Sequence, residues 1–361
     1  MDVFITHESA LEFWRLHRRS RSGNKYSRSR KRPPCESPES YTLRHGETWG
    51  LALPLDIMVG ERSFRRPSKA AVPHVCSKPV PDGAFVDAGG GLYVSSPEFC
   101  FFQLADAYPL ARLIALGIEL CGSYSLSSKA TAGADHGAIA GAEPGATASK
   151  DHSAFKQRVK GKASSGLVEA AGSNEYSASD QSIYNLPQLT NKTKLKAFVA
   201  RMGGWQGHKQ AIKALRYIAE DSASPMETIL FILLTLPYRY GGYGLPTPEL
   251  NGRIYPGKGV KRFSGRSFYR GDLLWRKAGV VAEYNSDLEH TGPERIARDA
   301  IRQSDLNLCG IYEIPVTKEQ IKNEELLDKV ARQIAARIGR QLRYKEPGFT
   351  EARKELRNVL L

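Results

Sequence analysis

The chain has 361 residues, 41% of them hydrophobic, which is enough to bury a sizeable core and favours two domains over one. Its 52 Lys and Arg outnumber its 38 Asp and Glu, giving a formal net charge of +14 at pH 7. A balance this basic favours phosphate-bearing or other anionic partners, although it can also serve only to keep a chain in solution. The five cysteines are widely spread and include no CxxC pair, which argues against a disulfide scaffold or a zinc finger.

The N-terminal sequence MDVFITHESALEFWR is acidic at Asp2 and has no apolar core, so it resembles neither a secretory signal nor a transit peptide. The longest apolar run, residues 229–237, is far too short to cross a bilayer. We therefore expect a cytoplasmic protein that makes no membrane contact.

Residues 1–124 alternate short helical and strand-like patterns, which predicts a smaller α+β domain. A helix is expected over residues 9–16, and a hairpin over residues 84–94 around three consecutive glycines. The sequence Ser96-Pro97-Glu98 then opens an amphipathic helix, which Pro109 divides into two consecutive helices.

A basic run with interleaved serines lies near the start of this domain. Such a run attracts a nucleic-acid backbone without reading bases, and the alternative is a solvated arm. Its members are Arg15, Arg18, Arg19, Arg21, Lys25, Arg28, Arg30, Lys31 and Arg32.

Residues 125–188 are rich in Ala, Gly and Ser with almost no large apolar periodicity, so we interpret most of them as a flexible linker. The last region, residues 189–361, begins with two predicted helices, over 190–202 and 207–219. The glycines of residues 241–244 follow a helix and not a strand, so they predict a turn with positive φ angles and no dinucleotide site.

The core of the last region, residues 224–343, opens with Ser224 as N-cap and Pro225 at the first helical position, followed by an apolar helix through residue 236. Strands are expected over 267–275 and 279–284, a helix over 293–304, a buried strand over 310–316 and a closing helix over 324–342. This order predicts a mixed α/β domain with helices on both faces of a mixed sheet.

Two carboxylates occupy the ends of the neighbouring predicted strands: Asp272 within RGDLLW and Glu283 within VVAEYNSD. Such a pair can converge on one hard divalent ion, Mg²⁺ or Mn²⁺, which would polarise a phosphate and generate the attacking hydroxide. Glu227, near the start of the apolar helix, can complete this site or orient a ligand. By spacing alone the pair is weak evidence, because acidic residues at strand ends are usually solvated.

The stretches SPMETILFILLTLPYRYGGYGLP, RGDLLW, VVAEYNSDLEHTGPERIARDAIRQSDL and LCGIYEIPVT resemble, in this order, the very-short-patch-repair-like branch of the PD-(D/E)XK restriction endonuclease superfamily. Many of its members are small bacterial proteins. The resemblance covers about residues 224–343 and implies a restriction-endonuclease-like domain acting on DNA. By position, Asp272 and Glu283 correspond to the metal carboxylates and Glu227 to the helix glutamate.

The sequence departs from this pattern at the third core position, which is usually Lys and is Asn285 here. Asparagine can position a water but does not readily act as a general base. His290 can take over the proton transfer, and a surface or packing role for it is equally compatible with the sequence. An impaired or inactive site is therefore one of the expectations.

Arginines on the following helix suit phosphate binding, because a guanidinium donates two parallel hydrogen bonds. They are Arg295, Arg298 and Arg302. The alternative is an exposed helix face on which Arg295 pairs with Asp299.

A weaker resemblance covers about residues 53–105, where LPLDIMVGERSFRRPSKAAVPHV and DAGGGLYVSSPEFCFFQLA are similar to part of the abortive-infection type IV antitoxins, which are DNA-binding repressors. Two hypotheses follow for the whole chain. The first is a metal-dependent endonuclease. The second is a non-catalytic DNA-binding repressor or antitoxin of a toxin–antitoxin or phage-defence system, with a protein partner or a second copy of the chain. A scaffold whose charge is incidental is the third alternative.

Overall fold

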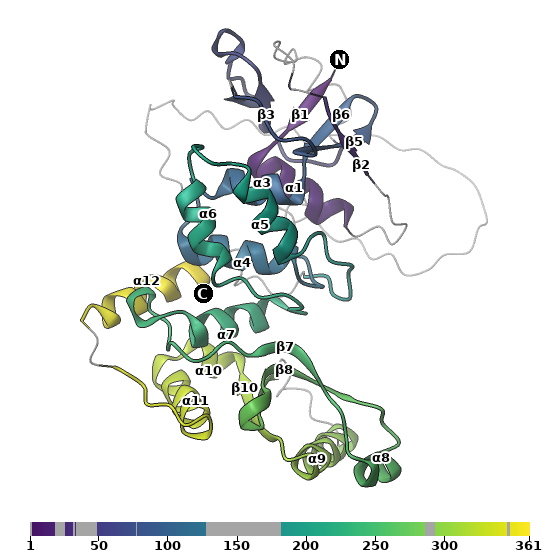
Figure 1. The fold of residues 1–361 in the computed structure, drawn as a ribbon, viewed down its shortest axis with the longest axis vertical. Coiled ribbons are helices and arrows are strands. Elements are labelled where there is room, and N and C mark those ends of the chain that lie inside the picture. Colours follow the sequence, from purple (N-terminus) through teal and green to yellow (C-terminus); the bar gives the residue numbers. More distant parts are fainter. Residues whose placement is uncertain are drawn as a thin grey trace, which may run out of the picture.

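The structure is a computed structural model that describes residues 2–18, 26–31, 33, 49–76, 78–127, 182–285, 293–344 and 347–361. It is a mixed α/β protein with one sheet near each end and helices between them (Figure 1). Within the described residues, no helix is long and apolar enough to cross a membrane.

The N-terminal sheet is six-stranded, with the order β2-β5-β6-β1-β3-β4. Its strands pair both in parallel, as β1 does with β6, and antiparallel, as β5 does with β6. The strands are β1 (Val3–Ile5), β2 (Ser27–Ser29), β3 (Leu55–Val59), β4 (Ala71–Val75), β5 (Phe85–Gly89) and β6 (Leu92–Ser95).

Helices cover this sheet and connect it to the C-terminal half. They are α1 (His7–His17), α3 (Pro97–Leu104), α4 (Leu110–Leu120), α5 (Lys192–Ala200) and α6 (His208–Leu215). The predicted helix at 9–16, the hairpin at 84–94 and the division at Pro109 are confirmed. Ser96 caps α3 by accepting a hydrogen bond from the backbone N–H of Phe99.

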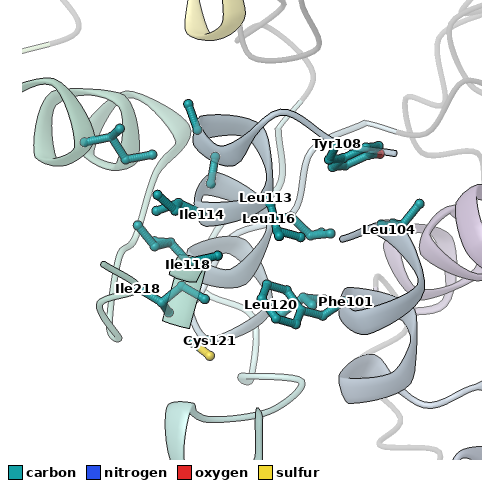
Figure 2. Packing of buried hydrophobic residues seen from close by; sticks show 14 of the residues in the cluster. Phe101, Leu104, Tyr108, Leu113, Ile114, Leu116, Ile118, Leu120, Cys121 and Ile218 are labelled. Carbon is teal, nitrogen blue, oxygen red and sulfur yellow. The ribbon is translucent and has the colours of Figure 1, made fainter. Parts of the chain in front are cut away.

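The helix α4 lies at the centre of the hydrophobic core (Figure 2). Leu120 lies beside Phe101 of α3, and Ile118 lies beside Ile218, which follows α6. Gly117 makes this close packing possible, since a Cβ at this position would come within 2.2 Å of the Ile218 side chain. The same core continues through α7 (Pro225–Thr235) into the second sheet.

The C-terminal sheet is four-stranded, with the order β10-β9-β8-β7. Its strands β7 (Glu249–Ile254), β8 (Tyr269–Trp275) and β9 (Val280–Asn285) are antiparallel neighbours, and β10 (Tyr312–Thr317) runs parallel to β9. The helix α9 (Pro293–Leu308) joins β9 to β10. The remaining helices are α8 (Lys258–Ser264), α10 (Lys318–Lys322), α11 (Glu324–Arg337) and α12 (Phe349–Leu360).

Helices pack on both faces of this sheet, as expected. Leu273 and Ala282 belong to the core shared with α7 and α11, whereas Leu274 and Val281 pack against Leu306 of α9. The sequence did not indicate β7, and the strand predicted as buried over 310–316 is an edge strand whose residues are alternately exposed and buried. The glycine turn is confirmed at Gly241 and Gly244, which have φ angles of 82° and 61°.

Candidate functional site

The register of the β8–β9 hairpin explains why the two predicted carboxylates meet. The last registered pair is Leu273 with Ala282, and Asp272 and Glu283 follow directly after it on the two strands. The Asp272 carboxylate accepts a hydrogen bond of 2.8 Å from the backbone N–H of Tyr284 and is also hydrogen-bonded to the Glu283 carboxyl group. Both lie inside their strands and not at the strand ends where the sequence predicted them, and Glu283 is only 8% exposed.

Glu227 lies in the first turn of α7, where Ser224 caps the helix by accepting a hydrogen bond from its backbone N–H. The Glu227 carboxylate accepts hydrogen bonds from the backbone N–H of Ala223, at 2.9 Å, and from the Asn251 amide, at 2.7 Å. Asn251 also donates to the backbone carbonyl of Asp221. Its φ of 50° is in the left-handed region, which asparagine tolerates better than most residues.

Burial and mutual repulsion weaken the acidity of these carboxyl groups. Burial, followed by the nearby Asp272 carboxylate, raises the pKa of Glu227 to about 7 and that of Glu283 to about 9. Burial also raises the pKa of Asp272 and of Glu313, the next acidic residue on this face, which β10 contributes. The side chains of Glu227, Asp272, Glu283 and Glu313 therefore form one electrostatically coupled group, which we call the carboxylate cluster.

Arg302 of α9 supplies positive charge to the carboxylate cluster. Its guanidinium donates to Glu283 at 2.5 Å and to the backbone carbonyl of Arg270 at 2.8 Å, and it lies 3.9 Å from Glu313. The Arg302 charge lowers the pKa of Glu283, and burial and Asp272 outweigh it. Arg302 is thus paired with a carboxylate in the structure, and its predicted contact with nucleic acid stays a prediction.

The other predicted site residues lie apart from the carboxylate cluster or outside the described chain. Asn285 is exposed at the end of β9, beside Thr317 of β10 in the sheet register. Arg298 is exposed on α9. His290 and the side chain of Arg295 lie outside the described residues.

Sequence reasoning missed Glu313 and Asn251. Glu313 lies in the motif LCGIYEIPVT. Side chains alternate between the two faces of a strand, so this alternation along β10 could have placed Glu313 on the same face as its pairing partner in β9. Asn251 had no such signal, because its strand was not predicted.

The carboxylate cluster has the chemistry of a site for a hard divalent ion. Within the part of the chain that the structure describes, no group of three or more His, Cys, Asp and Glu side chains is placed to hold a metal ion. Mg²⁺ is, however, usually held by only one or two protein carboxylates together with water and substrate phosphate. Asp272 and Glu283, in direct contact with one another, fit that requirement.

A polar cleft of about 730 Å³ adjoins the carboxylate cluster, bounded on one side by residues 219–221 and on the other by β7. Asn251, which holds Glu227, forms part of its wall, together with Arg253 and Arg270. The wall also includes the acidic residues Glu220, Asp221 and Glu249.

Comparisons with known proteins place the chain near proteins of unknown activity. Two curated proteins, each described as uncharacterised and each from a strain of Mycobacterium tuberculosis, are 28% identical to it over 151 residues. The match covers 42% of this chain and 49% of each relative, so the chain spans about half the length of the curated relatives it matches. No family model matches the chain. No solved structure matches it either.

Proposed function

We propose that the protein is a metal-dependent phosphodiesterase acting on nucleic acid, with the carboxylate cluster as its active site. The observation that carries the proposal is the contact between the buried Glu283 and the half-buried Asp272. Buried acids that repel one another are costly unless a proton or a cation compensates them, so the cluster is poised to take up positive charge.

The order of elements supports the same proposal. The succession of α7, β8, β9, α9 and β10 follows the order of the motifs on which the endonuclease resemblance of residues 224–343 rests, and β7 is an additional strand that the resemblance did not include. It brings the residues of three separate motifs, Glu227, Asp272 and Glu283, into one electrostatically coupled group.

Asp272 and Glu283 would hold the metal ion, which when bound supplies polarisation of the phosphate and an acidified water. Asn251 and the backbone N–H of Ala223 fix the orientation of Glu227. With a pKa of about 7, Glu227 can accept and return a proton near neutral pH. Arg302 would donate some of its hydrogen bonds to phosphate oxygens in place of Glu283.

The test is a cleavage assay on supercoiled, linear and single-stranded DNA and on RNA, with Mg²⁺ or Mn²⁺ and a chelator control. Asp272→Asn and Glu283→Gln should each lower the cleavage rate at least about a hundredfold, because each removes a charged metal ligand. Glu319→Gln, which neutralises an exposed glutamate of α10, is the matched control and should cleave normally. Metal-dependent cleavage that survives in both cluster variants would reject the assignment.

The second candidate is a non-catalytic nucleic-acid-binding protein of the repressor or antitoxin kind. The Arg302–Glu283 ion pair favours it, because a protein cation already compensates the carboxylate that a metal would need. This candidate predicts no cleavage with any of the metals and salt-sensitive binding that is unchanged by chelator. Wild-type cleavage abolished by chelator would exclude it.

A further inference from the structure

The hairpin of β7 and β8 extends away from the rest of the sheet and carries α8 in its connection (Figure 1). We call residues 253–270 of this hairpin the arm. The arm begins two residues after Asn251, which is hydrogen-bonded to Glu227, and ends two residues before Asp272. The base of the arm therefore lies next to the carboxylate cluster.

The arm is strongly basic and contains no Asp or Glu. Its cationic side chains are all exposed, and they are Arg253, Lys258, Lys261, Arg262, Arg266 and Arg270. Arg253 and Arg270 are direct cross-strand partners. Like charges in that position repel one another, so an anion bound between them would stabilise the arm.

Two aromatic rings are exposed among the side chains of the arm that the structure describes. Tyr255 is 65% exposed and Phe268 is 36% exposed, and their ring centroids lie 6.4 Å apart. The guanidinium carbon of Arg253 lies 4.9 Å from the Phe268 ring. Exposed aromatic rings among cations are the combination that holds single-stranded nucleic acid, in which the bases stack on the rings and the phosphates meet the cations.

The position of these side chains links them to the cleft. Arg253 and Arg270 line the polar cleft of about 730 Å³ that contains Asn251. Tyr255 and Phe268 each lie two residues from one of these arginines, farther from the carboxylate cluster. A strand whose bases stack on the rings would therefore have its next phosphates beside the arginine pair and would continue toward Glu227 and Asp272.

We propose that the arm binds a nucleic-acid strand with unpaired bases and leads its backbone into the carboxylate cluster. The faces of the bases are open in a single strand and hidden by stacking in a duplex, so the exposed rings favour the single strand. The inference rests on the proposed function only for what happens to the strand afterwards, since binding by the arm requires no metal.

The test measures the fluorescence anisotropy of a labelled single-stranded DNA of mixed sequence and of the same sequence as a duplex, both in chelator. The double variant Tyr255→Ala, Phe268→Ala should bind the single strand at least about tenfold more weakly and the duplex almost unchanged, since stacking is lost only for open bases. The double variant Arg253→Gln, Arg270→Gln should weaken both and reduce the salt dependence of binding.

Two control variants lie outside the arm. Tyr312→Ala removes a ring on β10 that is 41% exposed, and Lys329→Gln removes an exposed cation of α11. Both should bind as the wild type does. A loss in the controls equal to that of the arm variants would overturn the proposal, as would duplex binding that is as tight as single-strand binding and equally sensitive to the rings.

The two proposals fail separately. A wild type that prefers the single strand through the rings and cleaves nothing would retain the arm and reject the phosphodiesterase. Metal-dependent cleavage with no contribution of the rings to binding would do the reverse.

Discussion

Arg18 acts as a cap for backbone carbonyls in the interior of the protein. Its side chain is buried and its guanidinium donates to the carbonyl oxygens of Pro187, Glu119, Tyr124 and Gly122 at 2.5–3.2 Å. Arg18 belongs to the basic run in which the sequence predicted backbone binding or a solvated arm, and for Arg18 both expectations are wrong.

The same holds for Arg15, which is buried in a 2.8 Å ion pair with Glu119. Sequence composition identifies a cluster of cations but not which of them faces inward, because that depends on contacts with residues more than a hundred positions away. Local charge patterns carry no information on such partners.

Arg18→Met should lower the free energy of unfolding by about 3 kcal/mol or more, since it leaves several buried carbonyls without donors. Arg30→Met, in the same basic run and exposed, should change it by less than about 0.5 kcal/mol. Urea unfolding followed by circular dichroism measures both. Similar values for the two variants would contradict the interior role of Arg18.

Glu283 makes stability depend on pH in a direction unusual for a carboxylate. Burial raises the pKa of Glu283 in the folded protein to about 9. The contribution of Glu283 to the free energy of unfolding is therefore complete below its pKa in the unfolded chain, and it is lost as the pH rises toward its pKa in the folded protein. Between pH 5 and pH 8 in chelator, the wild type should therefore lose at least about 1 kcal/mol relative to Glu283→Gln, the equivalent of roughly one pKa unit. Parallel stability curves for the two proteins would show that Glu283 does not titrate in this range.

At the scale of elements, the turn after α7 needs glycine because α12 packs closely against it. Gly241 has a φ of 82°, and a Cβ there would lie 2.3 Å from the backbone oxygen of Ala352 in α12. Gly339 has a similar φ of 68° with nothing within 4 Å of a Cβ. The pair separates the cost of the backbone conformation from the cost of the contact.

Gly339→Ala should destabilise the protein by about 1 kcal/mol through backbone strain alone, and Gly241→Ala by about 2–4 kcal/mol because α12 must also move. Thermal denaturation of both variants measures the difference. Equal losses would mean that α12 does not press on this turn.

The elements that the sequence predicted are those with strong local signals. The capped helix at Ser224 and Pro225 and the apolar strand of β9 begin within two residues of their predicted positions. The strand β7, with the sequence ELNGRI, has Asn and Gly in its interior, and pairing with β8 overrides their low strand propensity. The sequence therefore predicted the carboxylate pair, and it could not predict Asn251 or the arm that depends on β7.

At the scale of the whole molecule, one hydrophobic core joins the two sheets, passing from β6 and α3 through α4 and α7 to β8 and β9. A buried hydrogen bond of 2.9 Å between Tyr124 and Thr228 crosses the same junction. If one half unfolded, the hydrophobic side chains of the other half that pack against it would become exposed to water.

The two halves should therefore unfold in one cooperative transition. Hydrogen exchange followed by mass spectrometry should give peptides from α3 and from α7 the same opening free energy near the global value. Two separate opening energies, or two thermal transitions, would show that the halves are independent.

The isolated bridge between Ser125 and Ile183 has a consequence for the evolution of this chain. Reciprocal backbone hydrogen bonds of 2.9 and 3.0 Å hold these residues side by side, although they are far apart in the sequence. Most of the predicted linker, residues 125–188, lies outside the described residues. Sequence inserted at such a bridge changes the entropy of loop closure only with the logarithm of its length, by roughly 0.6 kcal/mol for each doubling. The bridge therefore marks a permissive insertion point, where relatives can differ greatly in length while both sheets and the carboxylate cluster keep their geometry.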